Sequence, residues 1–99
     1  GRVEALVAGR DRFGNLALWA GPGELERARM APPDRVWVLV GDRRHRAAVG
    51  ATFADVPRGG LLVYPDSHGL LALAVNGGSA LERVAAAPGE VVALEAMGP

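Results

Sequence analysis

Residues 61–75 read Leu-Leu-Val-Tyr-Pro-Asp-Ser-His-Gly-Leu-Leu-Ala-Leu-Ala-Val, two apolar runs on either side of a polar stretch. Short apolar runs bounded by turn residues are typical of buried strands, and Asp and Gly are residues that tight turns favour. We therefore predict a β-hairpin with strands at 61–65 and 70–75. The second run is the longest uninterrupted apolar stretch of the chain, and it is far shorter than the roughly 20 residues that cross a bilayer.

Similar apolar runs recur along the rest of the chain, separated by Gly and Pro, which mark turns. Five further strands are predicted, at residues 3–8, 15–20, 35–41, 45–53 and 90–95. Short strands with no regular alternation of strand and helix favour a closed barrel or a sandwich over a doubly wound sheet. Because closure also removes exposed edges, we predict an all-β fold, a small closed antiparallel barrel of Greek-key type with about seven strands.

One or two short helices are expected beside these strands. Residues 78–84 place Ser79 and Glu82 at the spacing of a capping box, in which the hydroxyl accepts from a backbone N–H and the carboxylate reaches back. Pro88 disfavours helical geometry in the residue before it, so this helix should end ahead of it. Residues 24–30 contain helix formers between segments rich in Gly and Pro, and they predict either one or two helical turns or a loop.

Length and composition limit the chain to one domain, residues 1–99, because a chain of 99 residues cannot support two separate cores. Hydrophobic residues make up 49% of the chain but aromatic residues only 5%, so the core should be built from small branched side chains. The absence of Cys excludes disulfides, thiolate nucleophiles and the common zinc frameworks, and it fits a cytoplasmic protein. No signal peptide is visible at the N-terminus.

The charge balance argues against nucleic acid as a partner. All 11 basic residues are Arg, and 11 Asp and Glu residues offset them to a formal net charge of zero. Binding to nucleic acid needs clustered positive charge along the phosphates, and an oligonucleotide-binding barrel also needs aromatic side chains on which bases stack. We therefore expect a partner that is neither nucleic acid nor a membrane.

The first candidate binding segment is Asp11-Arg12-Phe13-Gly14-Asn15, which comes just before a predicted strand. These residue types favour tight turns, so the segment has a structural explanation in which Asp11 accepts local backbone N–H groups and Gly14 supplies a positive φ. A functional explanation also stands. A carboxylate can hold an ammonium group, an aromatic ring can stack on a purine, and the Asn15 amide can both donate to and accept from a base edge.

The second candidate segment is Asn76-Gly77-Gly78, which follows the second strand of the hairpin. Its glycines expose backbone N–H and C=O groups without side-chain obstruction, as the close approach of a flat base edge requires. Glycine is equally what a turn into a capped helix would use. Both explanations remain open for this segment.

Catalytic and metal-binding constellations are missing from the sequence. Ser67 and His68 do not form a catalytic pair, because adjacent side chains on a strand point to opposite faces. Neither His45 nor His68 has Cys, Asp or Glu at the spacing of a metal site. We therefore predict no catalytic residue, no metal ligand and no resident cofactor in this chain.

Four segments, in order along the chain, resemble landmarks of the C-terminal domain of the S-adenosyl-L-methionine (SAM) hydroxide adenosyltransferase family. That family includes the adenosine-forming SAM hydrolases, the fluorinases and the chlorinases. The landmarks are Asp-Arg-Phe-Gly-Asn at 11–15, Thr-Phe-Ala-Asp-Val-Pro-Arg-Gly at 52–59, Asp-Ser-His-Gly at 66–69 and Ala-Val-Asn-Gly-Gly-Ser-Ala at 74–80. The resemblance spans nearly the whole chain, and ordered landmarks are more specific than any one of them.

The resemblance implies a binding role within a larger enzyme. Members of the family resemble one another in having an N-terminal α/β domain and a C-terminal antiparallel barrel, and they assemble as homotrimers. SAM, as substrate, binds between the N-terminal domain of one subunit and the C-terminal domain of its neighbour. Hydroxide or halide attacks the ribose 5′ carbon and methionine leaves. The groups that position the nucleophile belong to the N-terminal domain, so this chain alone is expected to bind rather than to catalyse.

The resemblance assigns Asp11, Ser67 and His68 to the methionine end of the ligand. Asp11 matches the residue that binds the amino group of methionine. Ser67 and His68 match positions that contact the methionine carboxylate and amine. Halogenases carry Arg at the position of His68, whereas a His is neutral for part of the time near about pH 7.

The resemblance assigns five other residues to the adenosine end of the ligand. Phe13 would pack against adenosine, and Asn15 would hydrogen-bond the adenine edge. Asn76 and Gly77 fall where side-chain and main-chain groups read adenine. Phe53 is a further candidate for stacking on adenine.

An alternative hypothesis is a non-catalytic interaction or oligomerisation barrel that has lost the ligand site. The family often continues its first landmark with a Thr-Asn pair, and this chain has Leu18-Trp19 there, so polar contacts from those positions are lost. An exposed Trp19 would suit a protein interface, where Trp is enriched at energetic anchors. A Trp19 buried in the core would instead have a structural role, because Trp is mostly buried in proteins.

Overall fold

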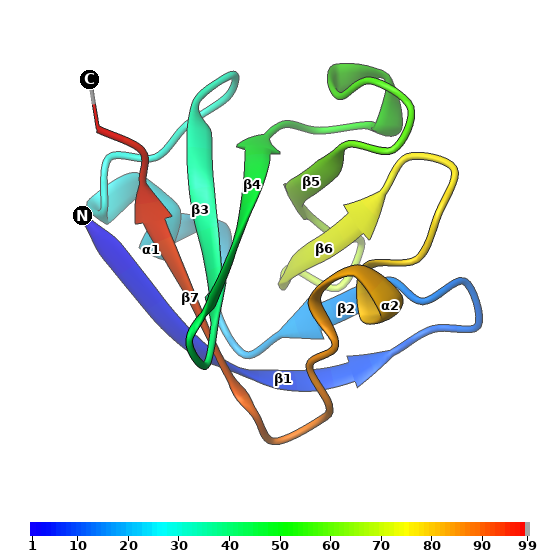
Figure 1. Ribbon diagram of the computed structural model, residues 1–99. Helices are drawn as coiled ribbons and strands as arrows, with labels where there is room; N and C mark the ends of the chain where they lie inside the picture. The colour runs from blue at the N-terminus through cyan, green and yellow to red at the C-terminus, as the bar shows by residue number, and fades with distance from the viewer. Residues whose placement is uncertain (99) are drawn as a thin grey trace.

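Seven strands close into a barrel in the computed structural model, which describes residues 1–98 (Figure 1). Around the barrel the strands follow the order β1-β2-β6-β5-β4-β3-β7, and β7 pairs with β1. In chain order the strands are β1 (Arg2–Arg10), β2 (Leu16–Leu18), β3 (Arg35–Val40), β4 (Arg43–Val49), β5 (Leu61–Pro65), β6 (Leu71–Val75) and β7 (Val91–Ala96). The predicted all-β closed barrel is confirmed.

β1 is the strand that closes the barrel. Its first half pairs antiparallel with β7 and its second half with β2, so one strand links both neighbours (Figure 1). The register shifts between Val7 and Gly9, and an irregularity of this kind bends a strand and increases its twist. Val3, Ala5 and Val7 alternate with exposed residues and point into the core, as the period of two in a strand requires.

β4 and β5 depart from the predicted antiparallel pattern because they run parallel, with Val49 opposite Val63. The other neighbouring pairs among the described strands are antiparallel. A parallel pair cannot be joined by a tight hairpin, so the chain crosses from β4 to β5 through residues 50–60. That crossover contains the short 3₁₀ helix η1 (Phe53–Asp55). The barrel is therefore mixed, although most of its pairs are antiparallel.

The prediction that the fourth strand reaches Phe53 is wrong, because β4 ends at Val49. The Asp55 carboxylate accepts hydrogen bonds from the backbone N–H groups of Ala51 and Thr52, at 2.7 and 3.0 Å. These bonds turn the chain out of the sheet before Phe53, which lies in η1 with 47% of its surface exposed. Hydrogen bonds from the Asp55 side chain to residues three and four positions earlier therefore end the strand, although the apolar pattern continues.

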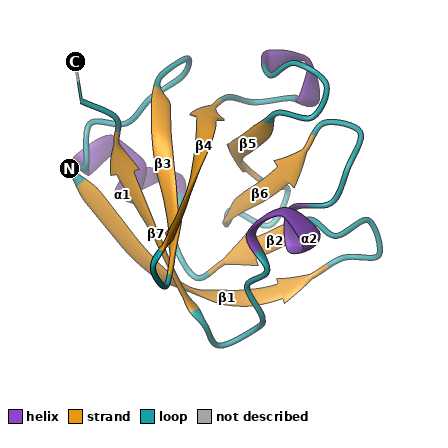
Figure 2. Cartoon of the chain, in the orientation of Figure 1, coloured by secondary structure: helices purple, strands orange, loops and turns teal. Residues whose placement is uncertain are grey.

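The helix α2 (Ala80–Val84) lies within the predicted range. Its N-cap is the hydroxyl half of the predicted capping box, since Ser79 Oγ accepts a hydrogen bond from the Glu82 N–H at 3.2 Å. Ala85 ends the helix in the left-handed conformation, with φ 51°. Figure 2 shows how short the helical segments are beside the strands of the barrel.

The helix α1 (Pro22–Arg27) begins and ends earlier than the predicted range of 24–30. Pro22 lies at the start of the helix, where its missing N–H costs no hydrogen bond. The Glu24 carboxylate accepts from the Gly21 N–H at 3.0 Å. Arg29 has φ 61°, which is incompatible with continued helix. Within residues 1–98, no helix is long and apolar enough to span a membrane.

The core is built from small branched side chains, as the composition predicts. Every buried hydrophobic residue of the described chain is Ala, Val, Leu or Met, and none is aromatic. The largest fully buried side chains include Leu16, Leu73 and Leu94, from three different strands. The rings of Phe13 and Trp19 are exposed instead. Large flat side chains are therefore available on the outer surface of this barrel.

His45 is a polar residue on the inward row of β4, two residues before the buried Ala47. Its Nε2 atom is buried and has no hydrogen-bond partner among the described residues. Burial lowers the pKa of His45, and the positive charges of Arg43 and Arg83 lower it further. The folded barrel therefore holds this imidazole in its neutral form more strongly than the unfolded chain does.

Acidification should destabilise the barrel through His45. In the unfolded chain His45 takes up a proton near the ordinary His pKa of 6.5, whereas in the folded chain it does so only at lower pH. The free energy of unfolding therefore falls as the pH drops below about 6.5. Urea unfolding at about pH 7.5 and about pH 5.5 measures this loss. His45→Asn should reduce the loss, whereas the exposed His68→Asn should retain it. Equal losses in His45→Asn and the wild-type chain would contradict the assignment.

Candidate functional site

A groove crosses the outer face of β1, β2, β6 and β5, and one row of cross-strand neighbours forms its floor. Gly9 is opposite Ala17, Ala17 is opposite Ala72, and Ala72 is opposite Tyr64. The first three residues have no side-chain atom beyond Cβ, so the sheet surface is low at these positions. A hollow of about 560 Å³ opens above them. Small residues on the outer face thus create a concave site of ligand size.

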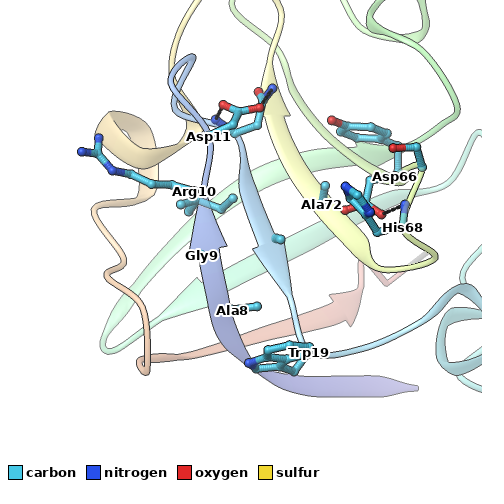
Figure 3. Close-up of a pocket in the computed structure, with 13 residues that line it drawn as sticks. Ala8, Gly9, Arg10, Asp11, Trp19, Asp66, His68 and Ala72 are labelled. Atoms are coloured by element: carbon cyan, nitrogen blue, oxygen red, sulfur yellow. Dashed lines mark hydrogen bonds between the residues drawn. The ribbon is translucent and has the colours of Figure 1, made fainter.

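The walls of this groove carry polar groups from two turns. Asp11 and Asn15 come from the turn between β1 and β2, and Ser67 and His68 come from the turn between β5 and β6. Figure 3 shows Asp11 and Trp19 at opposite ends of the groove, with His68 across the floor from β1. Two turns that are distant in sequence therefore lie along one groove.

A second hollow of about 710 Å³ adjoins the groove, and Asp11 and Asn15 border both. Its lining consists of Asp11, Phe13, Asn15, Phe53, Val75, Asn76, Gly77 and Gly78. The Phe53 ring contacts the Tyr64 ring, with centroids 6.4 Å apart and planes tilted by 50°, which links the second hollow to the groove. Each residue predicted to bind the ligand lines one of these two hollows.

The Asp11 carboxylate holds the β1–β2 turn together. Its Oδ1 accepts hydrogen bonds from the N–H groups of Phe13 and Asn15, at 2.9 and 3.0 Å, and its Oδ2 accepts from Asn15 Nδ2 at 2.9 Å. Burial favours the neutral acid, but the hydrogen bonds from Asn15 and Phe13 outweigh it and lower the pKa of Asp11. Asp11 is therefore an ionised carboxylate with a fixed orientation, and its structural explanation holds.

The β5–β6 turn repeats this arrangement. Asp66 Oδ1 accepts hydrogen bonds from the N–H groups of His68 and Leu70, at 2.8 and 3.0 Å. In each turn a glycine three residues after the Asp has a positive φ, 82° at Gly14 and 80° at Gly69. A carboxylate that accepts hydrogen bonds at this place in a turn fixes the backbone on both sides of it. The two walls of the groove are thus built by the same local chemistry.

Asn76 uses most of its polar groups inside the protein. Its Nδ2 donates to the carbonyl oxygens of Phe53 and Val56, at 3.2 and 3.0 Å. Its backbone N–H donates to the Gly60 carbonyl, and its own carbonyl accepts from the Gly59 N–H. Asn76 therefore fixes η1 at the border of the second hollow. Its neighbour Gly77 has a φ of 77°, which turns the chain at this hollow.

Tyr64 and Trp19 line the groove but were not among the predicted site residues. Burial raises the pKa of the Tyr64 phenol, and the negative charges of Asp11 and Asp66 raise it further. Trp19 is 64% exposed, which settles the choice between core and surface that the sequence left open. The sequence alone does not identify these two residues, because the way in which the strands pair decides which side chains reach the groove.

The described residues offer recognition chemistry and no metal site. Within residues 1–98, no group of three or more His, Cys, Asp or Glu side chains is arranged to hold a metal ion. The two hollows combine aromatic rings, amide groups and carboxylates, which suits a ligand with a flat ring at one end and a charged tail at the other.

The model of the SAM hydroxide adenosyltransferase C-terminal domain family matches residues 5–93. The chain is 47% identical over 81 residues to the (R)-S-adenosyl-L-methionine hydrolase of Salinispora arenicola (strain CNS-205). It is 40% identical over 80 residues to the protein of the same name from Salinispora tropica. Each match covers 81% of this chain but 28% of the relative, so the chain spans little more than a quarter of the length of these curated relatives.

Two solved structures share the fold. A crystal structure of an uncharacterized conserved protein from Thermotoga maritima superimposes with a TM-score of 0.90 at 35% sequence identity, over 94% of this chain and 35% of that protein. A crystal structure of a conserved hypothetical protein from Thermus thermophilus superimposes with a TM-score of 0.66 at 40% identity, over 92% of this chain and 34% of that protein. In both, the matched barrel is about a third of a longer chain.

The two glycines of the repeated turns should differ in their tolerance of a side chain. A Cβ at Gly14 would lie 2.0 Å from Ser79 Oγ, whereas a Cβ at Gly69 would meet no atom within 4 Å. Gly69→Ala should cost about 1–2 kcal/mol from its positive φ alone. Gly14→Ala should cost at least about 1 kcal/mol more, because Ser79 must move. Urea unfolding of both variants measures the difference, and equal losses would contradict the contact.

Proposed function

Because the chain belongs to the SAM hydroxide adenosyltransferase C-terminal domain family, we propose that it is the substrate-binding barrel of an enzyme that converts SAM and water to adenosine and methionine. The observation that carries this proposal is the arrangement of the two hollows. The residues assigned to the adenosine end and to the methionine end line adjoining hollows that share Asp11 and Asn15. A single extended ligand can therefore occupy both.

The second hollow suits the adenosine end of the ligand. Phe13 and Phe53 border it with exposed ring surface, 64% and 47% exposed respectively, on which a purine can stack. The Asn15 carboxamide lies at the border between this hollow and the groove. Gly77 adds main-chain groups that no side chain obstructs. These are the contacts that a flat base with polar edges requires.

The groove suits the methionine end of the ligand because of its charge. SAM carries a positive sulfonium and a positive ammonium group, and the groove contains the carboxylates of Asp11 and Asp66. Ser67 and His68 lie on the same wall and can donate hydrogen bonds to the methionine carboxylate. In this proposal the chain binds and orients SAM so that the ribose 5′ carbon faces the nucleophile.

The remaining groups of the active site would come from another domain. The proposal places an N-terminal α/β domain of a neighbouring subunit over the open side of the groove, within a cytoplasmic homotrimer. That domain would hold the attacking hydroxide, or a halide in a halogenase, and this chain would supply no catalytic residue. Its contribution to the rate would be orientation and binding of SAM.

A second candidate function, an interaction barrel without ligand, has one observation in its favour. Trp19, Leu6 and Val91 are exposed by 64%, 46% and 52%, and they form an apolar row in which Trp19 directly follows β2, Leu6 lies in β1 and Val91 in β7. Leu6 is opposite Val91, and its carbonyl accepts from the Trp19 N–H at 2.9 Å. Exposed apolar rows of this kind are typical of protein interfaces. The row does not account for the polar groups gathered in the two hollows.

Titration of the ¹⁵N-labelled chain with SAM tests the proposed function. The amides of the Asp11–Asn15 turn, of Ser67 and His68, and of Gly77 should shift together as SAM saturates the site. Adenosine should shift only the amides around the second hollow, and methionine only those of the groove. Absence of shifts at millimolar SAM, or shifts confined to other faces of the barrel, would contradict the proposal.

The Phe13→Ala variant sharpens this test. Loss of an exposed ring should weaken SAM and adenosine binding about tenfold, the size of one base-stacking contact, and should change stability little. Val91→Ala is the matched control, because Val91 is similarly exposed but borders neither hollow. A Phe13→Ala chain that binds adenosine as tightly as the control would rule out stacking on this ring.

A further inference from the structure

The Phe13 ring at the second hollow has a cation over it. The Arg12 guanidinium lies over this ring, with its Cζ atom 4.9 Å from the ring centroid. A guanidinium within about 6 Å of a ring centroid is attracted to the face of the ring. Phe13 is still 64% exposed, so Arg12 covers part of the ring and leaves the rest open.

Phe13 and Arg12 differ in their relation to the second hollow. Phe13 belongs to the lining of that hollow, and Arg12 does not. The ring rather than the guanidinium therefore borders the space that a ligand would fill. Because an aromatic ring has two faces and one guanidinium occupies one of them, the other face stays free for stacking.

The main chain of Phe13 is fixed, but its side chain is not held by burial. The Phe13 N–H donates to Asp11 Oδ1 at 2.9 Å, which fixes the place of this residue in the β1–β2 turn. Among residues 1–98, no cation other than Arg12 and no second ring pairs with the Phe13 ring. Arg12 can therefore orient a ring that burial leaves free to rotate.

A cation on one face also decides what the opposite face attracts. The face of an aromatic ring is the negative part of its quadrupole, and the positive charge of Arg12 takes up that attraction. A second cation on the free face would be repelled by the first. The free face of Phe13 therefore favours a neutral, electron-rich partner such as adenine over the sulfonium of SAM.

We propose that Arg12 is a positioning residue for the adenosine end of the ligand. Its guanidinium covers the face of Phe13 that is turned away from the second hollow and holds the opposite face toward adenine, without touching the ligand. The inference rests on the proposed function and adds to it the residue that orients the stacking ring. Orientation before binding raises affinity, because less side-chain freedom is lost when the ligand arrives.

Trp37 supplies a matched control for this arrangement. The Arg44 Cζ atom lies 4.4 Å from the Trp37 ring centroid, so this pair has the same chemistry as Arg12 and Phe13. Trp37 and Arg44 are on β3 and β4 and line neither the groove nor the second hollow. Removal of Arg44 therefore deletes a guanidinium of the same kind away from the proposed ligand.

Adenosine is the probe for the first measurement, because it is neutral and its affinity responds little to the loss of a charge. Its dissociation constant is read from the Gly77 amide shift of the ¹⁵N-labelled chain. Arg12→Ala should weaken adenosine binding about 2- to 5-fold, the size of one exposed cation–π contact, and Arg12→Lys should recover most of this loss. Arg44→Ala should bind adenosine as the wild-type chain does. Unchanged affinity in Arg12→Ala, no recovery in Arg12→Lys, or an equal loss in Arg44→Ala would overturn the inference.

A double-mutant cycle separates positioning from direct contact with the ligand. If Arg12 acts through the ring, Arg12→Ala should not weaken adenosine binding further once Phe13→Ala has removed the ring. A further loss of the same size in that background would assign the guanidinium to the ligand itself and overturn the inference. Weaker binding in Phe13→Ala with no effect of Arg12→Ala would also overturn it and leave the proposed function standing. If adenosine and SAM shift no amide of the wild-type chain, the proposed function and this inference fall together.

Discussion

Closure of the barrel by β1 is the constraint on which the rest of the structure depends. Because β1 pairs with both β2 and β7, the sheet has no open edge, and its inner face is filled by Val, Leu and Ala side chains. These side chains occupy the inside of the barrel, and the groove lies on its outer wall. The outer wall is concave where Gly9, Ala17 and Ala72 stand in one row. The site is thus a consequence of which small residues face outward.

The two aspartate turns convert that concave wall into a polar site. Each carboxylate accepts two backbone N–H groups, which fixes the turn and orients the charge before any ligand arrives. Groups held in this way lose little conformational freedom on binding, so more of the interaction energy appears as affinity. The β1–β2 turn is fixed further by α2, since the Leu81 N–H donates to the Gly14 carbonyl at 2.9 Å. A rigid scaffold therefore presents the polar groups of the candidate site from loops.

The sequence predicts those features that depend on neighbours along the chain. The hairpin around Asp66 and the Ser79 cap follow from local turn and capping chemistry, and both are present. The parallel pairing of β4 with β5 and the position of Phe53 depend on how Asp55 turns the crossover, and apolar periodicity contains no such signal. Trp19 was missed for a related reason. It lies at a bend directly after β2, and its backbone N–H donates to the Leu6 carbonyl of β1, so its place in the groove depends on a contact with a strand that is distant in sequence.

The candidate site divides into residues that also hold the fold and residues that do not. The side chains of Asp11, Asn15 and Asn76 make hydrogen bonds to the turns or to η1, so their removal alters the geometry of the site as well as its contacts. Phe13 and Trp19 are exposed and have no such bonds, so their removal subtracts a contact from a scaffold that stays in place. Loss of binding on removing a fold-holding residue therefore cannot separate recognition from folding. The exposed side chains that make no hydrogen bonds within the described residues, Phe13 and Trp19 among them, are therefore the ones whose removal would report contact with a ligand without altering the fold.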